Sequence, residues 1–246
     1  MALALAAQAA AGQTLDEIVS RAVAAQGGLA RIRATQTRIT TGKISFDGGG
    51  ENPFTVEQKR PDRMHMKIFF PAGVLVRGYD GVAGWQASPF AERKDAQPLS
   101  PEETRGIAEE AEFDDALVDW QARGSKMQLL GKEVVEGRPA FRLRVTLKSG
   151  LVQDVFLDAE SYLKVRWEGA RPINGTTTVF QSSFADYRAV RGLRLPFRIR
   201  SHAQGNEGRQ EIVITNVELN APIDEARFAL ARPAEKAATP AKPDRP

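Results

Sequence analysis

Apolar and polar residues alternate along much of this chain, and a period of two is typical of β-strands with one buried face. The alternation is clearest within residues 59–86, where every second position is apolar at Met64, Met66 and Ile68. Further on, Asp80 and Gly81 separate two short apolar runs. Because an Asp-Gly pair favours the tight turn of a hairpin, this segment is predicted to form a strand, a bend and a hairpin.

The same alternation recurs at intervals up to residue 219. It predicts strands at 38–46, 53–60, 127–135, 139–147, 151–158, 163–169, 176–190, 195–202 and 211–219. Strands joined by short loops pair most simply with their neighbours in antiparallel fashion, and a sheet of about ten strands must curl or split. The predicted fold is therefore mainly β (α+β): a single curved antiparallel sheet forming an incomplete β-barrel covered by helices. A closed, lipocalin-like barrel is the competing topology.

Two segments carry helix signals instead. Thr14 and Glu17 form a capping box, and apolar residues at helical spacing follow as far as Gly27. A serine followed by a proline opens a second helical segment at 101–123, which is rich in acidic residues. These carboxylates form either a solvated helix face or a docking surface for a basic partner.

The two ends of the chain differ in composition from the middle. Residues 1–12 are rich in alanine and resemble the end of a signal peptide with small-residue cleavage sites, although an alanine-rich helical or disordered start is the alternative. Residues 232–246 are rich in Pro, Ala and Lys and are predicted to be a disordered tail. A single domain is therefore expected at 13–231, in a soluble monomer exported to the periplasm.

Composition and motifs offer little chemistry. The net charge of +3 is too small to indicate nucleic-acid binding, and the absence of cysteine excludes disulfides, thiolate metal sites and cysteine nucleophiles. Neither His65 nor His202 has a metal-ligand spacing, and both are predicted to lie at the surface. Asp154, Asp158 and Glu160 form an acidic group that turn chemistry explains. No catalytic residue, metal site or cofactor is expected, and the protein is predicted not to be an enzyme.

Apolar surface is the property that remains. An acyl chain of about 16 carbons costs on the order of 13 kcal/mol to expose to water, at roughly 0.8 kcal/mol per methylene. A protein that carries such a chain needs a concave apolar wall, which one-sided strands and a covering amphipathic helix can build. The alternation alone does not distinguish a hollow wall from a filled core.

Several motifs resemble those of a known family. An alternating strand lies between Lys59-Arg60-Pro61 and Asp80-Gly81 with Trp85, which resembles the K-R-P … D-G-x-x-x-W core of the LolA/LolB-like lipoprotein carriers. The motifs that follow in order are Phe156-Leu157-Asp158, Leu163-x-Val165-Arg166, Phe184-x-Asp186-Tyr187-Arg188 and Asn220-x-Pro222-Ile223-Asp224. Their order across nearly all of 14–231 is more specific than any single motif. The chain is similar to exported, LolA-like outer-membrane lipoprotein-sorting proteins.

The resemblance implies an incomplete barrel with a helical lid, which holds lipoprotein acyl chains or another lipid in a hydrophobic cavity. Arg60 would hold the lid through hydrogen bonds to its backbone, although an ion pair with a surface carboxylate is the alternative. The expected cavity-lining residues are Met64, Met66, Ile68, Trp85, Phe141, Leu143, Val145, Trp167 and Phe180. An inner-membrane donor complex and an outer-membrane acceptor would be the partners. No cysteine lies near the N-terminus, so a soluble carrier is favoured over a membrane-anchored acceptor.

Two other functions stay open at this point. The same fold could serve an envelope-stress sensor that binds lipid and docks a membrane-bound partner through its acidic segment, at Glu109 and Glu110. It could equally be a structural domain with a filled core. The acidic segment and the Pro-rich tail have no counterpart in the family pattern. A cavity between the first helix and the sheet would separate the filled core from the other two functions.

Overall fold

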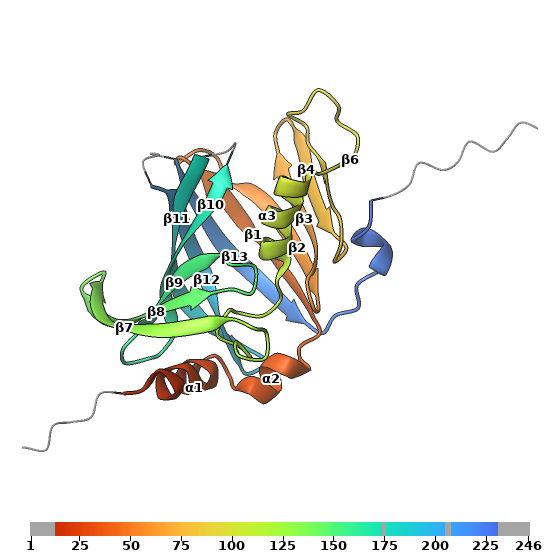
Figure 1. The fold of residues 1–246 in the computed structure, drawn as a ribbon. Helices are drawn as coiled ribbons and strands as arrows, with labels where there is room; N and C mark the ends of the chain where they lie inside the picture. The colour runs from red at the N-terminus through yellow and green to blue at the C-terminus, as the bar shows by residue number, and fades with distance from the viewer. Residues whose placement is uncertain (1–12, 174–175, 205–207, 231–246) are drawn as a thin grey trace, which may run out of the picture.

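A single antiparallel sheet makes up most of the computed structural model, which describes residues 13–173, 176–204 and 208–230 (Figure 1). The strands are β1 (Thr37–Phe46), β2 (Asn52–Lys59), β3 (Arg63–Phe70), β4 (Gly73–Tyr79), β5 (Gly84–Ala87), β6 (Gln97–Pro98), β7 (Lys126–Val135), β8 (Arg138–Thr146), β9 (Val152–Asp158), β10 (Lys164–Ile173), β11 (Thr176–Val190), β12 (Leu193–Ala203) and β13 (Arg209–Leu219). The predicted signal-peptide remnant at 1–12 and the predicted tail at 232–246 lie outside the described residues.

The first and last strands pair at the centre of the sheet. The strand order is β6-β5-β4-β3-β2-β1-β13-β12-β11-β10-β9-β8-β7, so two meanders run outward from the β1–β13 pair. Within the described residues, the edge strands β6 and β7 do not pair with each other. The sheet is therefore an open, curved half-barrel, as the sequence predicts, and the closed lipocalin-like barrel is excluded.

The predicted hairpin of the 59–86 segment forms between β4 and β5. The Oδ1 atom of Asp80 accepts hydrogen bonds from the amides of Val82 and Ala83 at 2.9 and 2.8 Å. Gly81 has φ of 100°, a conformation that favours glycine. The predicted Asp-Gly turn is therefore confirmed, because the Asp80 side chain caps the turn and Gly81 has the positive φ that the turn requires.

Two helices, α1 (Leu15–Ala25) and α2 (Leu29–Ala34), lie along one end of the half-barrel (Figure 1). The predicted capping box begins α1: Thr14 Oγ1 accepts from the Glu17 amide at 3.3 Å, and Glu17 Oε2 accepts from the Thr14 amide at 2.9 Å. The chain turns at Gly27, where a Cβ atom would lie 2.4 Å from a carbonyl oxygen of the β11–β12 turn. Only glycine permits so close an approach. No helix in the described part of the chain is long and apolar enough to span a membrane.

The third helix, α3 (Pro101–Ala111), lies over the concave face beside β3, β4 and β5 (Figure 1). Its N-terminus has the predicted cap, but the prediction of helix as far as 123 is wrong, because residues 112–115 are irregular and residues 116–124 form turns. In this turn segment, residues 112–124, the carboxylates of Asp114 and Asp115 pair with basic side chains of the sheet and its flanking loop. Tertiary ion pairs have overridden the local helix signal.

Buried apolar side chains fill part of the concave face beneath each helix. The group under α1 is Ile18, Val19, Ala22, Phe141, Leu143, Val145 and Leu157. The group around α2 and the central strands includes Ile32, Ile44, Phe54, Ile68, Leu193 and Phe197. The group under α3 is Met64, Tyr79, Ile107 and Ala111. The helices cover these three areas, and the space between them contains the hollows described below.

The segment after β13 crosses the outer face of the sheet. It contains the short helix η1 (Glu225–Arg227), which lies outside β3 and β4 in Figure 1. Phe228 follows and is 1% exposed. Trp85 lies beneath it and donates from Nε1 to the Phe228 carbonyl oxygen at 2.8 Å. This segment, 220–230, therefore acts as a strap over the outer face.

The strap explains why His65 is buried, whereas the sequence predicts a surface position. His65 is 6% exposed, and its Nδ1 lies 2.8 Å from Glu57 Oε2. Arg227 of the strap donates from Nη1 to Glu57 Oε1 at 2.5 Å. The polar side of a strand becomes exposed only if nothing covers it, and here the strap does. His202, on β12, is half-buried.

Candidate functional site

Three connected hollows lie on the concave face, with volumes of about 600, 1240 and 390 Å³. We call them the groove, the mouth and the polar pocket, in that order. Arg77 and Gln210 line both the groove and the mouth, whereas Arg38 and Leu195 line both the groove and the polar pocket. Since neighbouring hollows share lining residues, they lie next to one another between the helices and the sheet.

The groove is apolar because six strands turn one alternate set of side chains toward it. Val56 pairs with Met66 and Phe54 pairs with Ile68 across β2 and β3, which places all four on the same face. The apolar lining residues are Ile44, Phe46, Phe54, Val56, Met66, Ile68, Leu75, Leu195, Pro196, Ile199, Ile212, Ile214 and Val217. A flexible methionine among branched side chains makes such a wall adaptable to ligands of different shape.

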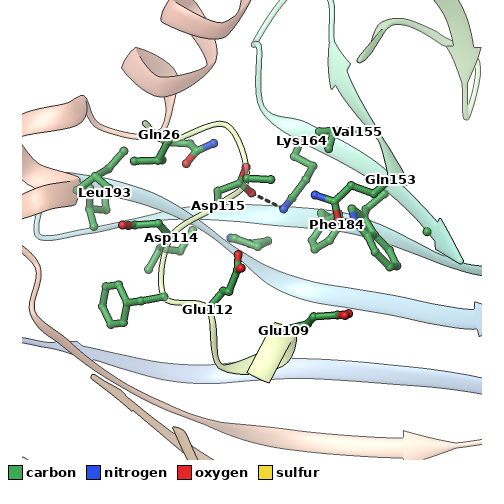
Figure 2. Close-up of a pocket in the computed structure, with 18 of the residues that line it drawn as sticks. Gln26, Glu109, Glu112, Asp114, Asp115, Gln153, Val155, Lys164, Phe184 and Leu193 are labelled. Atoms are coloured by element: carbon green, nitrogen blue, oxygen red, sulfur yellow. Dashed lines mark hydrogen bonds and ion pairs between the residues drawn. The ribbon is translucent and has the colours of Figure 1, made fainter. Parts of the chain in front are cut away.

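The polar pocket contains a buried charge pair between the turn segment 112–124 and the sheet (Figure 2). Lys164 Nζ donates to Asp115 Oδ2 at 2.5 Å and lies 4.6 Å from the centre of the Phe184 ring. Burial raises the pKa of the Asp115 carboxyl, but the charge and hydrogen bond of Lys164, the Leu117 amide and the charge of Arg123 together hold the pKa below its usual range. Burial also raises the pKa of Tyr187, whose hydroxyl donates to the Lys164 carbonyl oxygen at 2.7 Å. The pair ties the turn segment to the sheet.

The mouth opens beside α3 and is lined on its far side by Trp167 and Phe180. The indole Nε1 of Trp167 donates to Gln153 Oε1 at 2.8 Å. Its ring lies over Gly169, where a Cβ atom would be 2.5 Å from the indole. The half-buried Trp167 therefore occupies space that a side chain at position 169 would fill.

Arg60 follows β2 and joins the sheet to α2 and to the turn segment. Its Nε donates to the Thr35 carbonyl oxygen at 2.5 Å, and its Nη2 donates to that of Ile32 at 2.7 Å. Nη2 also donates to Asp114 Oδ1 at 2.7 Å, and the guanidinium stacks 4.6 Å from the centre of the Phe113 ring. Both contacts that the sequence left as alternatives are present: the backbone of a covering helix and a carboxylate. The role of Arg60 as a latch remains a prediction.

The structure distributes the predicted cavity-lining residues over four places. Met66 and Ile68 line the groove. Trp167 and Phe180 line the mouth. The residues packed in the filled core are Met64, Phe141, Leu143 and Val145. Trp85 lies beneath the strap, on the outer face of the sheet. We therefore retain four of the nine residues as candidates to line a ligand site.

Most of the groove comes from strands in which the sequence singled out no site residue, and β12 and β13 make one side of it. Leu195 and Ile199 of β12 and Ile212 and Ile214 of β13 form this wall. Their alternation is visible in the sequence, but only the central pairing of β1 with β13 places them opposite Met66. Arg38 was also missed, because no pattern predicts a guanidinium on the concave face.

An open antiparallel half-barrel, with helices over its concave face and a hollow beneath them, is the LolA-like fold. Two solved structures match this fold over most of the chain. A DUF1329 family protein from Desulfovibrio piger has a TM-score of 0.62 at 13% identity, covering 89% of this chain and 98% of its own. A LolA superfamily protein from Nitrosomonas europaea has a TM-score of 0.55 at 14% identity, covering 89% and 98%.

A third solved structure is described as a putative outer membrane lipoprotein-sorting protein domain, from Vibrio parahaemolyticus. Its TM-score is 0.58 at 14% identity, and the match covers 86% of this chain and 94% of that one. At these identities the likeness shows the fold. No family model and no curated protein sequence matches the chain.

Proposed function

We propose that this protein is a periplasmic carrier or binding protein that holds lipoprotein acyl chains, or a related lipid, as part of outer-membrane lipoprotein sorting. The observation that carries the proposal is the apolar groove of about 600 Å³, which lies beside the mouth at α3. Pockets that hold small ligands commonly have volumes of about 300–1,000 Å³ and mostly apolar walls. The groove has both properties.

The energetics favour an acyl ligand. Each methylene that enters the groove leaves water with a gain of roughly 0.8 kcal/mol. Most of its lining side chains are aliphatic or aromatic; the polar ones are Arg38, Thr40, Gln58, Arg77, Gln86, Glu110 and Gln210. The groove therefore suits a hydrocarbon chain better than a sugar or a peptide. We propose no catalytic role for the protein.

The fold and the contacts of Arg60 support the sorting role. The Vibrio parahaemolyticus structure shares the fold and is described as lipoprotein-sorting. Arg60 bonds the carbonyl oxygens at the end of α2, so it is placed to hold a covering helix against the sheet. A lid held by a few hydrogen bonds can open at modest cost, as a carrier that loads and releases cargo requires.

The other two functions have less support. A concave face that its own side chains filled would not leave an apolar groove of about 600 Å³. A sensor that docks a partner through its acidic segment needs free carboxylates. Glu110, Glu112 and Asp114 instead pair with Arg77, Arg123 and Arg60. We therefore favour the carrier.

A substitution that fills the groove tests the proposal. Ile212 faces the groove, whereas its neighbour Val213 points to the outer face. We expect Ile212→Trp to weaken the binding of Nile red, an uncharged apolar probe, by roughly tenfold, because the indole occupies the ligand's space. Val213→Trp is the matched control and should bind as wild type.

The wild-type protein should also release Nile red when a lipidated peptide is added. Fluorescence titration measures both effects. If wild-type protein does not take up the probe, or if a lipidated peptide fails to displace it, the carrier proposal is wrong. Equal weakening by both tryptophan variants would show that the groove is not the site.

A further inference from the structure

The groove and the polar pocket meet at a cation that lacks a carboxylate partner. Arg38 of β1 lines both hollows. Its Nε and Nη2 donate to Gln58 Oε1 at 3.1 and 2.6 Å, and its guanidinium lies 5.1 Å from the centre of the Phe113 ring. Among the residues that the structure describes, Nη1 of Arg38 has no hydrogen bond, and no carboxylate lies within ion-pair distance of the guanidinium.

The acidic side chains around this position have other partners. Those with a basic partner are Glu110 with Arg77, Glu112 with Arg123, Asp114 with Arg60 and Asp115 with Lys164, at 2.9, 2.6, 2.7 and 2.5 Å. These carboxylates therefore form ion pairs with other basic residues, and none of them forms an ion pair with Arg38. Burial lowers the pKa of Arg38, the charge of Arg60 acts in the same direction, and the charge of Asp114, which is paired with Arg60, only partly opposes them.

A second donor in the same groove also lacks an acceptor. Arg77 of β4 uses Nη1 to bond Glu110, but its Nε is buried and has no hydrogen-bond partner within the described residues. Arg77 lines the groove together with Arg38. Buried donors are seldom left unsatisfied, and each one costs free energy unless a ligand or water completes it.

We propose that Arg38, assisted by Arg77, binds the anionic head group of an acyl ligand whose hydrocarbon chain lies in the groove. The chemical class is a fatty chain that ends in a carboxylate or a phosphate. The guanidinium presents paired donors that match either oxyanion, and the partly buried setting strengthens the bond. This inference rests on the proposed function, because it names which acyl ligands the same hollow prefers.

Three ligands with one chain length test the head group. Dodecanoic acid, dodecyl phosphate and dodecanol are titrated at neutral pH against Nile red bound to the wild-type protein. We expect the two anions to displace the probe at about tenfold lower concentration than the alcohol, since one charge-assisted hydrogen bond gives a factor of this size. Stronger displacement by the phosphate than by the carboxylate would point to a phospholipid source, and the reverse to a free fatty acid.

Two variants remove the preference by different routes. Arg38→Gln deletes the charge, and Gln58→Glu leaves Arg38 in place but supplies the carboxylate it lacks. In both, the anions should bind no better than dodecanol. Arg38→Lys keeps a cation and should retain part of the preference. Arg191→Gln, at an exposed turn outside the hollows, makes the same charge change and should keep all of it.

The outcomes separate this inference from the proposed function. If wild-type protein binds all three ligands equally, the anion site is wrong and the carrier proposal stands. If none of the three displaces Nile red, the carrier proposal itself fails. An unchanged preference in Gln58→Glu would also overturn the assignment to Arg38, even if Arg38→Gln does not fold.

Discussion

Arg60 connects three parts of the chain that are far apart in sequence. Its guanidinium donates to two carbonyl oxygens at the end of α2 and to the carboxylate of Asp114, and each of its three nitrogens forms at least one hydrogen bond. The side chains of Arg60 and Asp114 are only 18% and 19% exposed. A hydrogen-bonded ion pair in such a setting is worth more than one at the surface.

Replacing Arg60 with leucine should loosen α2 and leave Asp114 without a partner. We expect Arg60→Leu to lower the free energy of unfolding by about 2 kcal/mol and to speed the release of bound Nile red. Arg33→Leu is the matched control, because Arg33 on α2 pairs with Asp119 but is 59% exposed, and it should cost less than about 1 kcal/mol. Urea unfolding and stopped-flow release measure the two effects. Unchanged release in Arg60→Leu would show that Arg60 is not a latch.

His65 makes stability depend on pH. Burial lowers the pKa of its imidazole, although Glu57 acts in the opposite direction; Lys67 and Arg227 also lower the pKa. The neutral form is therefore favoured in the folded state. The stability from His65 is complete above its unfolded pKa of about 6.5 and is lost as the pH falls toward the lower folded value.

We therefore expect the melting temperature of the wild-type protein to fall between about pH 6.5 and pH 5. The same fall should be smaller in His65→Gln, since glutamine does not take up a proton. His202→Gln is the control for removing a histidine elsewhere. Circular dichroism melts at several pH values measure this slope. The same slope in wild type and in His65→Gln would contradict the role of His65.

Adjacent strands on the outer face repeat one ion-pair arrangement. On β8, Arg142 and Arg144 both pair with Asp154 of β9, and on β12, Arg198 and Arg200 both pair with Glu211 of β13. Alternation places the two arginines of each pair on one face, and antiparallel register places the acid directly opposite one arginine, Arg144 or Arg200, and diagonal to the other. Burial distinguishes the two sites, because the Asp154 side chain is 8% exposed and that of Glu211 is 35% exposed.

This difference predicts unequal costs for the same substitution. Burial raises the pKa of Asp154, but its hydrogen bonds with Arg144 and Arg142 outweigh burial, so the pKa lies below its usual range. We expect Asp154→Asn to lower the free energy of unfolding by about 2 kcal/mol at neutral pH. Glu211→Gln should cost less than about 1 kcal/mol. Chemical denaturation of both variants measures the difference, and equal costs would refute the argument.

At the scale of elements, the strands were more predictable than the helices and irregular segments that pack on the sheet. Alternation located β7 to β13 to within a few residues, and capping chemistry located the starts of α1 and α3. It failed for residues 112–124, where Asp114 and Asp115 bond to distant basic groups that no local pattern reveals. The family resemblance also implied that Trp85 lines the cavity, but the pairing of the short strand β5 turns its side chain to the outer face, and the sequence of β5 alone does not show this pairing.

At the scale of the whole molecule, the candidate site depends on which areas of the concave face the helices cover. Phe141, Leu143 and Val145 have the same pattern as Met66 and Ile68, yet α1 packs on the first set and leaves the second facing the groove. Helix docking is a long-range property, so alternation predicts an apolar face without showing where it is hollow. The anionic preference proposed for Arg38 could not be predicted from the sequence for the same reason. Only the folded sheet brings Arg38 close to acidic residues that pair with other basic groups.

The position of Trp167 gives the protein an optical signal of its own. Of the three tryptophans, Trp85 lies beneath the strap and Trp120 packs beside α1, whereas Trp167 faces the mouth and bonds Gln153. Indole emission shifts when water near the ring is replaced by hydrocarbon. A chain that extends from the groove past Arg77 into the mouth replaces this water. We therefore expect dodecanoic acid to shift the intrinsic fluorescence of the wild-type protein and of Trp120→Phe, but not of Trp167→Phe. A shift that persists in Trp167→Phe would show that the ligand binds elsewhere. If the shift is lost in Trp167→Phe, the fluorescence of Trp167 allows loading and release to be followed without an added dye.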